Sequence, residues 1–152
     1  MEGTRGIEGA FMRDVIAVVR GLGRQVGVWQ EAAECGALRP GEGYAIGWTS
    51  NEANRALAAA GYDVVAAPAQ AYYLDMADSA DWSAPGAFWA GVITPETVAA
   101  FDPSAGWSTV ERGRLRGVQA CLWSEHVHDR HIMRRLLVPR LAVFADRAWH
   151  ER

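Results

Sequence analysis

Hydrophobic residues recur at helical spacing near the start of the chain. Residues 7–23 carry an apolar side chain every three or four positions, which predicts an amphipathic helix, and Gly23 is a suitable C-terminal stop. The members of this apolar stripe are Phe11, Val15, Val18, Val19 and Leu22. The chain therefore opens with a helix that has one strongly apolar face.

Four later runs are almost continuously apolar and predict buried β-strands. They comprise residues 24–31, 44–50, 63–68 and 117–123. The first is expected to end at Trp29, the second at Trp48 and the fourth at Trp123, while Pro68 ends the third. Near-continuous apolar strands of this kind are typical of a parallel sheet that is covered on both faces.

Helical signals separate and follow these strands. Thr49 and Glu52 have the spacing of a capping box, and they precede a helix of about ten residues that Gly61 closes. The last segment, residues 130–149, predicts a long amphipathic helix in which Pro139 produces a kink.

The element order is a helix followed by four strands, each with a helix or helical turn after it. This order fits two α/β architectures: a small doubly wound sheet, or four βα units of a (β/α)₈ barrel. No GxGxxG follows a strand, which weakens a nucleotide-binding interpretation. Residues 77–93 predict a long irregular loop, and such loops inside compact domains are often functional.

Aromatic and acidic residues gather where the predicted strands end, and this favours the barrel. Trp29, Trp48 and Trp123 finish three of the strands, and the other leads into Tyr73 and Asp75. A barrel builds its active site at the C-terminal ends of its strands, and aromatic rings also stack on the apolar faces of sugars. Simple core packing of these aromatic residues is the alternative.

Composition narrows the possible partners. The 152 residues are 50% hydrophobic, and the net charge of −3 argues against general nucleic-acid affinity. The N-terminus has no apolar signal core and no run of about 18 apolar residues occurs, so we expect a soluble chain without an export signal, its compartment left open.

Cys35 and Cys121 are expected to be buried free thiols, with a disulfide as the alternative, and Trp107 and Trp149 are expected to pack.

Four segments resemble one enzyme family. They are GRQVGVWQEA, YYLDMA, GVQACLWSE and VPRLAVFADRAW. Together they resemble the C-terminal half of the catalytic barrel of family 20 glycoside hydrolases, the β-N-acetylhexosaminidases. The resemblance extends from about Phe11 to Trp149. It implies that residues 1–152 form a single partial domain corresponding to strands 5–8 of a (β/α)₈ barrel.

The resemblance also implies roles for particular residues. In the family, three tryptophans wall a pocket around the N-acetyl group of the sugar; here they are Trp29, Trp48 and Trp123. A tyrosine donates a hydrogen bond to the acetamido oxygen, a role that falls to Tyr73. Two carboxylates bind sugar hydroxyls, and these are Asp75 and Glu125. The implied ligands are glycans that contain N-acetylhexosamine, and no cofactor is implied.

The family's mechanism requires a catalytic pair that this sequence does not contain. The substrate's own acetamido oxygen attacks the anomeric carbon, while an Asp-Glu pair orients the acetamide and acts as acid and base. No Asp-Glu or Glu-Asp dipeptide occurs in the chain, and the spacing of Glu31 and Glu34 gives no reason to expect a replacement acid. We therefore expect a fragment or truncated gene product. The full enzyme would release terminal N-acetylglucosamine or N-acetylgalactosamine, whereas this chain would be inactive alone.

Two further expectations concern partners. An open half-barrel exposes strand edges and an apolar inner face, so the chain is expected to need the missing N-terminal half or a second copy, as a homo-oligomer. The alternative to an enzyme part is a non-catalytic module that binds sugar or self-assembles.

The histidines after the fourth strand raise a third possibility, a metal-dependent hydrolase. His126, His128 and His131 have a spacing that superficially suits a metal, with Asp129 and Glu125 as the acidic partners at hand. The family uses no metal for catalysis, so we expect solvated loop histidines and no metal site.

Overall fold

A computed structural model describes residues 2–149, with side chains described from residue 6 onward. Its contacts divide the chain into two compact units. Unit 1 comprises Met1–Ala66 and Ser104–Arg116, and unit 2 comprises Ala67–Pro103 and Gly117–Arg152. Each unit is therefore built from two separate segments of the sequence and is described by itself.

Unit 1 begins with the predicted amphipathic helix, α1 (Glu2–Gly21). Just after it, Gly23 has a positive φ of 67°, and its N–H donates to the Arg20 carbonyl at 2.8 Å. The Arg24 N–H then donates to the Val19 carbonyl at 3.3 Å. Glycine adopts this left-handed conformation without a Cβ penalty, so the prediction that Gly23 stops the helix is confirmed.

Most of the apolar stripe on α1 faces solvent. Ile16, which lies outside the predicted stripe, is buried at 5% exposure, and Met12 and Val19 pack beside it against the core. The stripe residues with the largest exposed fractions are Phe11 (64%), Val18 (64%) and Leu22 (72%), and Ile7 near the start of the helix is 74% exposed. Helix α1 therefore has two apolar faces, of which unit 1 buries one.

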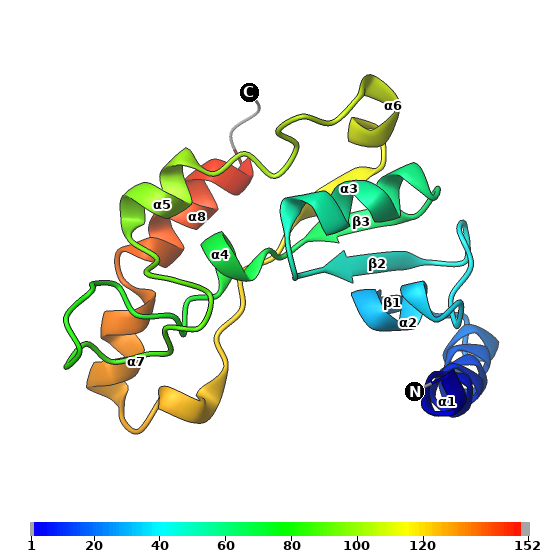
Figure 1. Cartoon of the computed structure of the whole chain (residues 1–152), viewed down its shortest axis with the longest axis horizontal. Coiled ribbons are helices and arrows are strands. Elements are labelled where there is room, and N and C mark those ends of the chain that lie inside the picture. Colours follow the sequence, from blue (N-terminus) through cyan, green and yellow to red (C-terminus); the bar gives the residue numbers. More distant parts are fainter. Residues whose placement is uncertain (1, 150–152) are drawn as a thin grey trace. The chain divides into compact units, whose positions relative to one another are not determined.

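The sheet has four strands in the order β1-β2-β3-β4 (Figure 1). Their bounds are β1 Gly27–Trp29, β2 Tyr44–Gly47, β3 Asp63–Ala66 and β4 Leu115–Val118. Strands β1, β2 and β3 pair in parallel, and the Val64 N–H donates to the Arg114 carbonyl at 2.9 Å beside β4. An α/β fold with a four-stranded sheet is confirmed.

Helices α2 (Gln30–Glu34) and α3 (Asn51–Ala59) follow β1 and β2, and α6 (Thr109–Arg112) precedes β4 (Figure 1). Val64 and Leu38 are fully buried in the hydrophobic core of this unit. Trp107 belongs to the same core at 5% exposure and donates its indole N–H to Asn51 Oδ1 at 3.1 Å, so its predicted packing role is confirmed.

The cap of α3 differs from the prediction by one residue. Ser50 is the N-cap, and its hydroxyl accepts from the Ala53 N–H at 3.1 Å. Thr49 is occupied elsewhere, because its hydroxyl donates to Gln30 Oε1 at 3.0 Å. The predicted closure is confirmed, since Gly61 follows the helix with a φ of 94°.

Unit 2 is mostly helical. Its helices are α4 (Ala69–Tyr72), α5 (Pro95–Ala100), the 3₁₀ helix η1 (Ser124–His126), α7 (Arg130–Leu137) and α8 (Arg140–Trp149). Helices α5 and α8 lie side by side (Figure 1). Tyr72 packs edge-on against Phe101 and Phe144, with ring centroids 5.3 and 5.0 Å away. Residues 77–93 contain no helix, as predicted.

Two predictions for the C-terminal region are wrong. Pro139 does not kink one long helix but separates α7 from α8, because proline lacks the N–H that would continue the helical ladder. Trp149 does not pack, since it is 86% exposed. Within residues 2–149, none of the helices combines the length and the apolar character needed to cross a lipid bilayer.

The fourth strand also lies elsewhere than predicted. It occupies Leu115–Val118 rather than 117–123, so Trp123 does not end a strand but forms the N-cap of η1. The neighbouring strand β3 ends at Ala66, two residues before Pro68, so the ladder has no partner to extend β4. A strand exists only where a neighbour satisfies its backbone groups, and apolar sequence alone does not supply that neighbour.

Candidate functional site

Tyr73 is held by a short backbone pairing in unit 2. It forms an isolated parallel bridge with Cys121. The Leu74 N–H donates to the Cys121 carbonyl at 2.7 Å, and the Cys121 N–H donates to the Tyr72 carbonyl at 2.9 Å. The segment that contains Tyr73 and the segment leading to Trp123 are thereby fixed side by side.

Two tryptophan rings pack against the ring of Tyr73. Its ring centroid lies 5.9 Å from that of Trp123 and 6.0 Å from that of Trp89, both in edge-to-face geometry. Tyr73 is 4% exposed, whereas Trp123 and Trp89 are 40% and 61% exposed. The cluster therefore presents two tryptophan surfaces to solvent beside a buried tyrosine. Sequence reasoning did not assign Trp89 to the site, although it placed this residue in the irregular loop 77–93.

Asp75 is a buried carboxylate beside the same cluster. It is 3% exposed, and its Oδ1 has no hydrogen-bond partner among the described residues. Burial raises the pKa of Asp75, and the Glu125 charge adds to the increase. The backbone N–H groups of Asp75 and Trp123, together with His126, act in the opposite direction. Asp75 thus has an acceptor oxygen available for a ligand donor.

Glu125 lies on η1 and is exposed, close enough to Asp75 for their charges to interact. The histidines do not form a metal site with it: no group of three potential ligands gathers anywhere in the described part of the chain. Asp129 instead caps α7, accepting from the His131 and Ile132 N–H groups at 2.7 and 2.9 Å. These bonds lower the pKa of Asp129.

Trp29 and Trp48 lie at neighbouring strand ends in unit 1. Trp29 is the last residue of β1, and Trp48 directly follows β2, which pairs with β1. Both side chains are half-buried. The strand ends are joined by Gln30, a buried side chain whose Oε1 accepts from the N–H groups of Trp48 and Thr49, each at 3.3 Å.

Glu31 orients the Trp48 ring. Its Oε1 accepts the indole N–H of Trp48 at 2.7 Å. Glu34 is used differently, since its Oε1 accepts from Gln30 Nε2 at 2.6 Å. Both carboxylates thus have partners in the scaffold around Trp48. Sequence reasoning weighed these residues only as replacement acids and did not foresee these contacts.

The structure brings the predicted residues together as two groups. Trp29 and Trp48 form one in unit 1; Tyr73, Asp75, Trp123 and Glu125 form the other in unit 2. Both cysteines are free thiols. Cys121 is buried as expected, whereas Cys35 is half-buried, which the prediction of two buried thiols did not foresee. Burial raises the pKa of Cys121, which favours an unreactive thiol.

The chemistry of the unit 2 group suits a neutral polyhydroxylated ring. Carboxylates accept strong charge-assisted hydrogen bonds from hydroxyl groups, and exposed indole faces pack on the apolar faces of sugars. The sequence profile described as the glycosyl hydrolase family 20 catalytic domain matches residues 1–152. The chain belongs to this family.

Relatives in family 20 are much longer than this chain. A β-hexosaminidase of Vibrio furnissii is 30% identical over 141 residues, which are 91% of this chain and 23% of the relative. A β-N-acetylhexosaminidase of Cellulomonas fimi is 34% identical over 136 residues, 88% of this chain and 27% of the relative. The chain therefore spans about a quarter of the length of these family 20 proteins.

Solved family 20 structures share the fold. One is a family 20 exo-β-N-acetylglucosaminidase from Vibrio harveyi, solved in complex with N-acetylglucosamine. It superimposes on this chain with a TM-score of 0.87 at 30% identity, and the match includes 97% of this chain and 23% of the Vibrio harveyi chain. The family 20 β-N-acetylhexosaminidase of Streptomyces coelicolor A3(2) gives a TM-score of 0.79 at 30% identity, covering 93% of this chain and 29% of its own. The α/β arrangement of this chain is therefore that of part of a family 20 structure.

Proposed function

We propose that this chain supplies the N-acetyl-sugar-binding part of a β-N-acetylhexosaminidase barrel, corresponding to barrel strands 5–8 in one partial domain. Such an enzyme releases terminal N-acetylglucosamine or N-acetylgalactosamine from glycans by a substrate-assisted mechanism. The observation that carries the proposal is the group of Tyr73, Trp123 and buried Asp75 in unit 2, in a chain that belongs to family 20.

Each residue of the proposed site has a role suited to its chemistry. Tyr73 donates a hydrogen bond to the acetamido oxygen, and Asp75 and Glu125 accept hydrogen bonds from sugar hydroxyls. Trp123 forms an apolar wall of this site in unit 2, and the family resemblance gives the role of an apolar wall to Trp29 and Trp48 in unit 1 as well. The unpartnered Oδ1 of Asp75 supports its role, because a buried acceptor without a partner is costly until a donor reaches it.

Binding of N-acetylglucosamine and of its thiazoline, a mimic of the cyclised intermediate, tests the proposal. Both are titrated into the wild-type chain by calorimetry and tryptophan fluorescence. Tyr73→Phe should weaken thiazoline binding about tenfold through the loss of one hydrogen bond. Tyr62→Phe is the matched control, because the Tyr62 hydroxyl serves the core of unit 1 through the Ala33 and Leu38 carbonyls. No wild-type binding, or equal binding by Tyr73→Phe, would refute the proposed site.

The isolated chain is proposed to be catalytically inactive. The sequence contains no Asp-Glu dipeptide to orient the acetamide and to protonate the leaving group. Release of nitrophenol from nitrophenyl N-acetylglucosaminide by the purified chain would overturn this proposal, provided that Tyr73→Phe removes the activity and so excludes a contaminant.

A self-assembling, non-catalytic module is the second candidate, and the exposed face of α1 favours it. This face holds Ile7, Phe11, Val18 and Leu22, all at least 64% exposed. Contiguous exposed apolar surface usually marks an interaction site. The face suits packing against the rest of a family 20 barrel, or against a second copy when the chain is studied by itself.

Sedimentation at micromolar concentration tests self-association. We expect a dimer that the double variant Phe11→Ser/Val18→Ser converts to a monomer. Val110→Ser is the control, since Val110 is 80% exposed in the same unit but lies on α6. A stable wild-type monomer would count against self-association through this face.

A further inference from the structure

Arg140 is a fully buried cation at the start of α8 in unit 2. It is 1% exposed, and it is the largest fully buried side chain in the described part of the protein. Burial lowers the pKa of Arg140, while the charges of Asp78 and Asp75 raise it. A buried arginine is costly unless its donors are satisfied, so its hydrogen bonds indicate what it does.

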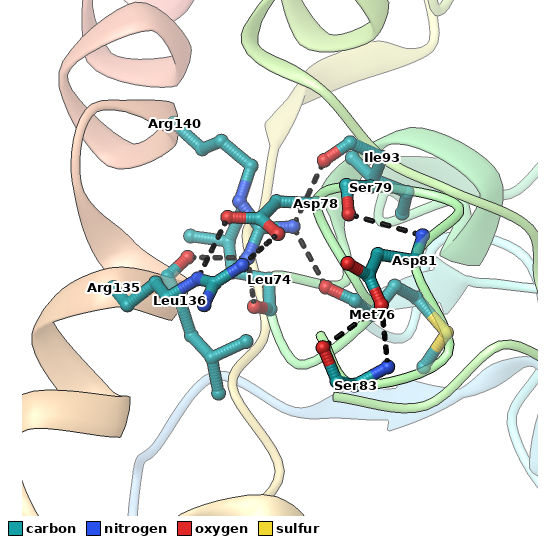
Figure 2. Close-up of polar contacts among 10 residues, drawn as sticks. All are labelled: Leu74, Met76, Asp78, Ser79, Asp81, Ser83, Ile93, Arg135, Leu136 and Arg140. Atoms are coloured by element: carbon teal, nitrogen blue, oxygen red, sulfur yellow. Dashed lines mark hydrogen bonds and ion pairs between the residues drawn. The ribbon is translucent and has the colours of Figure 1, made fainter. Parts of the chain in front are cut away.

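The guanidinium of Arg140 donates to four backbone carbonyls (Figure 2). Nη1 donates to Met76 at 2.8 Å and to Ile93 at 3.0 Å. Nη2 donates to Leu74 at 2.7 Å and to Leu136 at 2.6 Å. One side chain thus joins the Leu74–Met76 segment to the end of the loop and to the last turn of α7.

Two of these carbonyls flank Asp75. The Leu74 carbonyl belongs to the peptide group before Asp75, and the Met76 carbonyl to the residue after it. The Asp75 carbonyl itself accepts the Ala87 N–H at 2.9 Å, and the Ala77 N–H donates to the Ala87 carbonyl at 2.8 Å. Since the backbone is fixed on both sides of Asp75, the direction of its Cα–Cβ bond is fixed as well.

The neighbouring carboxylates do not compete for this cation. Asp78 is paired with Arg135, whose Nη2 lies 3.2 Å from Oδ1 of Asp78 (Figure 2). Asp81 accepts the N–H and hydroxyl of Ser83, each at 2.8 Å, within the loop. The guanidinium of Arg140 therefore bonds backbone carbonyls instead of a carboxylate. Two of these carbonyls belong to the irregular Leu74–Met76 segment, which isolated bridges connect to other segments.

We infer that Arg140 is a positioning residue for Asp75, holding that carboxylate toward the sugar hydroxyl that it accepts. The inference rests on the proposed function, because it gives Asp75 a ligand. Arginine is required rather than lysine, because only the planar fork directs donors at carbonyls on two sides at once. A lysine ammonium retains the charge but carries three donors at a single point.

A double-mutant cycle in the full chain tests the inference. Wild type, Arg140→Lys, Asp75→Asn and the double variant are titrated with N-acetylglucosamine thiazoline. Arg140→Lys should weaken binding about tenfold when Asp75 is present, through misplacement of that carboxylate, and should have little further effect beside Asp75→Asn. Arg135→Lys is the matched control, a neighbouring arginine that bonds the Asp78 carboxylate, and should bind as wild type does.

The outcomes separate the two hypotheses. Equal weakening by Arg140→Lys in both Asp75 backgrounds indicates a general structural role and overturns the inference, as does unchanged binding. If wild type binds no sugar, the proposed function fails, and amide hydrogen exchange decides the positioning role. Faster exchange at Ala77 and Ala87 in Arg140→Lys than in Arg135→Lys supports that role, and equal exchange overturns it.

If Arg140→Lys does not fold, a second variant and a measurement on the wild-type chain still test the inference. Arg140→Gln, which keeps a smaller neutral donor, enters the same cycle. If neither variant folds, the thiazoline should increase amide protection at Ala77 and Ala87 in the wild-type chain. Unchanged protection in a chain that binds the thiazoline overturns the inference.

Discussion

The two units hold their proposed site residues by different physical means. In unit 1, Trp29 and Trp48 end or follow strands whose backbone groups pair in a parallel ladder above a hydrophobic core. In unit 2, Tyr73 and Asp75 lie on an irregular segment with isolated bridges, which the buried Arg140 holds by its carbonyls. The first arrangement is held by regular strand pairing, whereas the second is held by a few isolated backbone bonds and by a buried charged side chain.

This difference predicts where each unit is most sensitive to substitution. Unit 1 should lose most stability when its close packing is disturbed, because apolar burial and the sheet provide its order. Unit 2 should lose most stability when a buried polar group is removed. Its backbone carbonyls would then lack a donor, and in the buried interior no water replaces the one that was lost. Five substitutions test this contrast, beginning with the largest effect.

Arg140→Met should destabilise the protein by about 4 kcal/mol, because it leaves four carbonyls without their donor. Urea denaturation followed by circular dichroism and tryptophan fluorescence measures the change. Arg55→Met in unit 1 is the control, since Arg55 is 52% exposed in its ion pair with Glu111 and should cost about 0.5 kcal/mol at most. Similar losses for the two variants would remove the contrast between the units.

Gly47→Ala should cost about 2 kcal/mol in unit 1, because the added Cβ meets Oδ1 of the buried Asn54. Gly113→Ala is the matched control: its φ of −62° is ordinary, and the nearest atom to a new Cβ lies at 3.4 Å. It should change the unfolding free energy by less than about 0.5 kcal/mol. If Gly47→Ala is as stable as Gly113→Ala, the packing between β2 and α3 is looser than described.

Asp75→Asn should raise the melting temperature by about 3 °C at pH 7, and the gain should disappear near pH 3. Burial raises the folded-state pKa of Asp75, so the protonated form is favoured. The stability that protonated Asp75 contributes to the fold is fully present below the unfolded-state pKa, and it is lost as pH rises through the folded-state pKa. Asparagine has no such loss. Calorimetry at a series of pH values measures the difference.

Asp129→Asn should change the melting temperature at pH 7 in the opposite direction to Asp75→Asn. Two N–H groups at the start of α7 lower the pKa of Asp129, so its contribution is present above the unfolded-state pKa and is lost as pH falls through the folded-state pKa. Its replacement should therefore lower the melting temperature at pH 7 and not at pH 2. A pH-independent difference for Asp75→Asn would contradict the cost assigned to the buried charge.

Glu31→Gln should have the smallest effect, a change in melting temperature below about 1 °C. The glutamine oxygen still accepts the Trp48 indole N–H, and the β1–β2 ladder is unaffected. Glu8→Gln on the exposed surface of α1 is the comparison variant. A large loss from Glu31→Gln alone would show that Trp48 depends on a single carboxylate, as the unit 2 residues depend on Arg140.

Much of the local structure could be predicted from the sequence. Helix α1, its glycine stop and the first three strands follow from apolar spacing and from turn residues that act over a few positions. The family could also be recognised, because its motifs are contiguous segments. The family resemblance assigns Tyr73, Asp75, Trp123 and Glu125 to a sugar site that also includes Trp29 and Trp48. The first four form one group in unit 2, and the sugar site itself stays a prediction.

The failures occurred where a residue's state depends on distant partners. The apolar run at 117–123 predicted a strand, but the neighbouring β3 had already ended. Thr49 had the sequence of an N-cap, but the Gln30 side chain engages its hydroxyl and Ser50 caps the helix instead. Trp89 belonged to an irregular loop, where no periodic pattern indicated that its ring would reach Tyr73.

The sequence by itself determined the succession of helices and strands, the family, and the residue types available for a sugar site, since these depend on short-range spacing. Only the tertiary structure decided that Arg140 binds four carbonyls and that two of them flank Asp75. These two hydrogen bonds join residues whose positions in the chain differ by 64 and by 66. Contacts at such separations leave no periodic signal in a single sequence. The sequence could not indicate these partners, because the acceptors are backbone carbonyls, which every residue carries, and only the fold brings four of them around the buried cation.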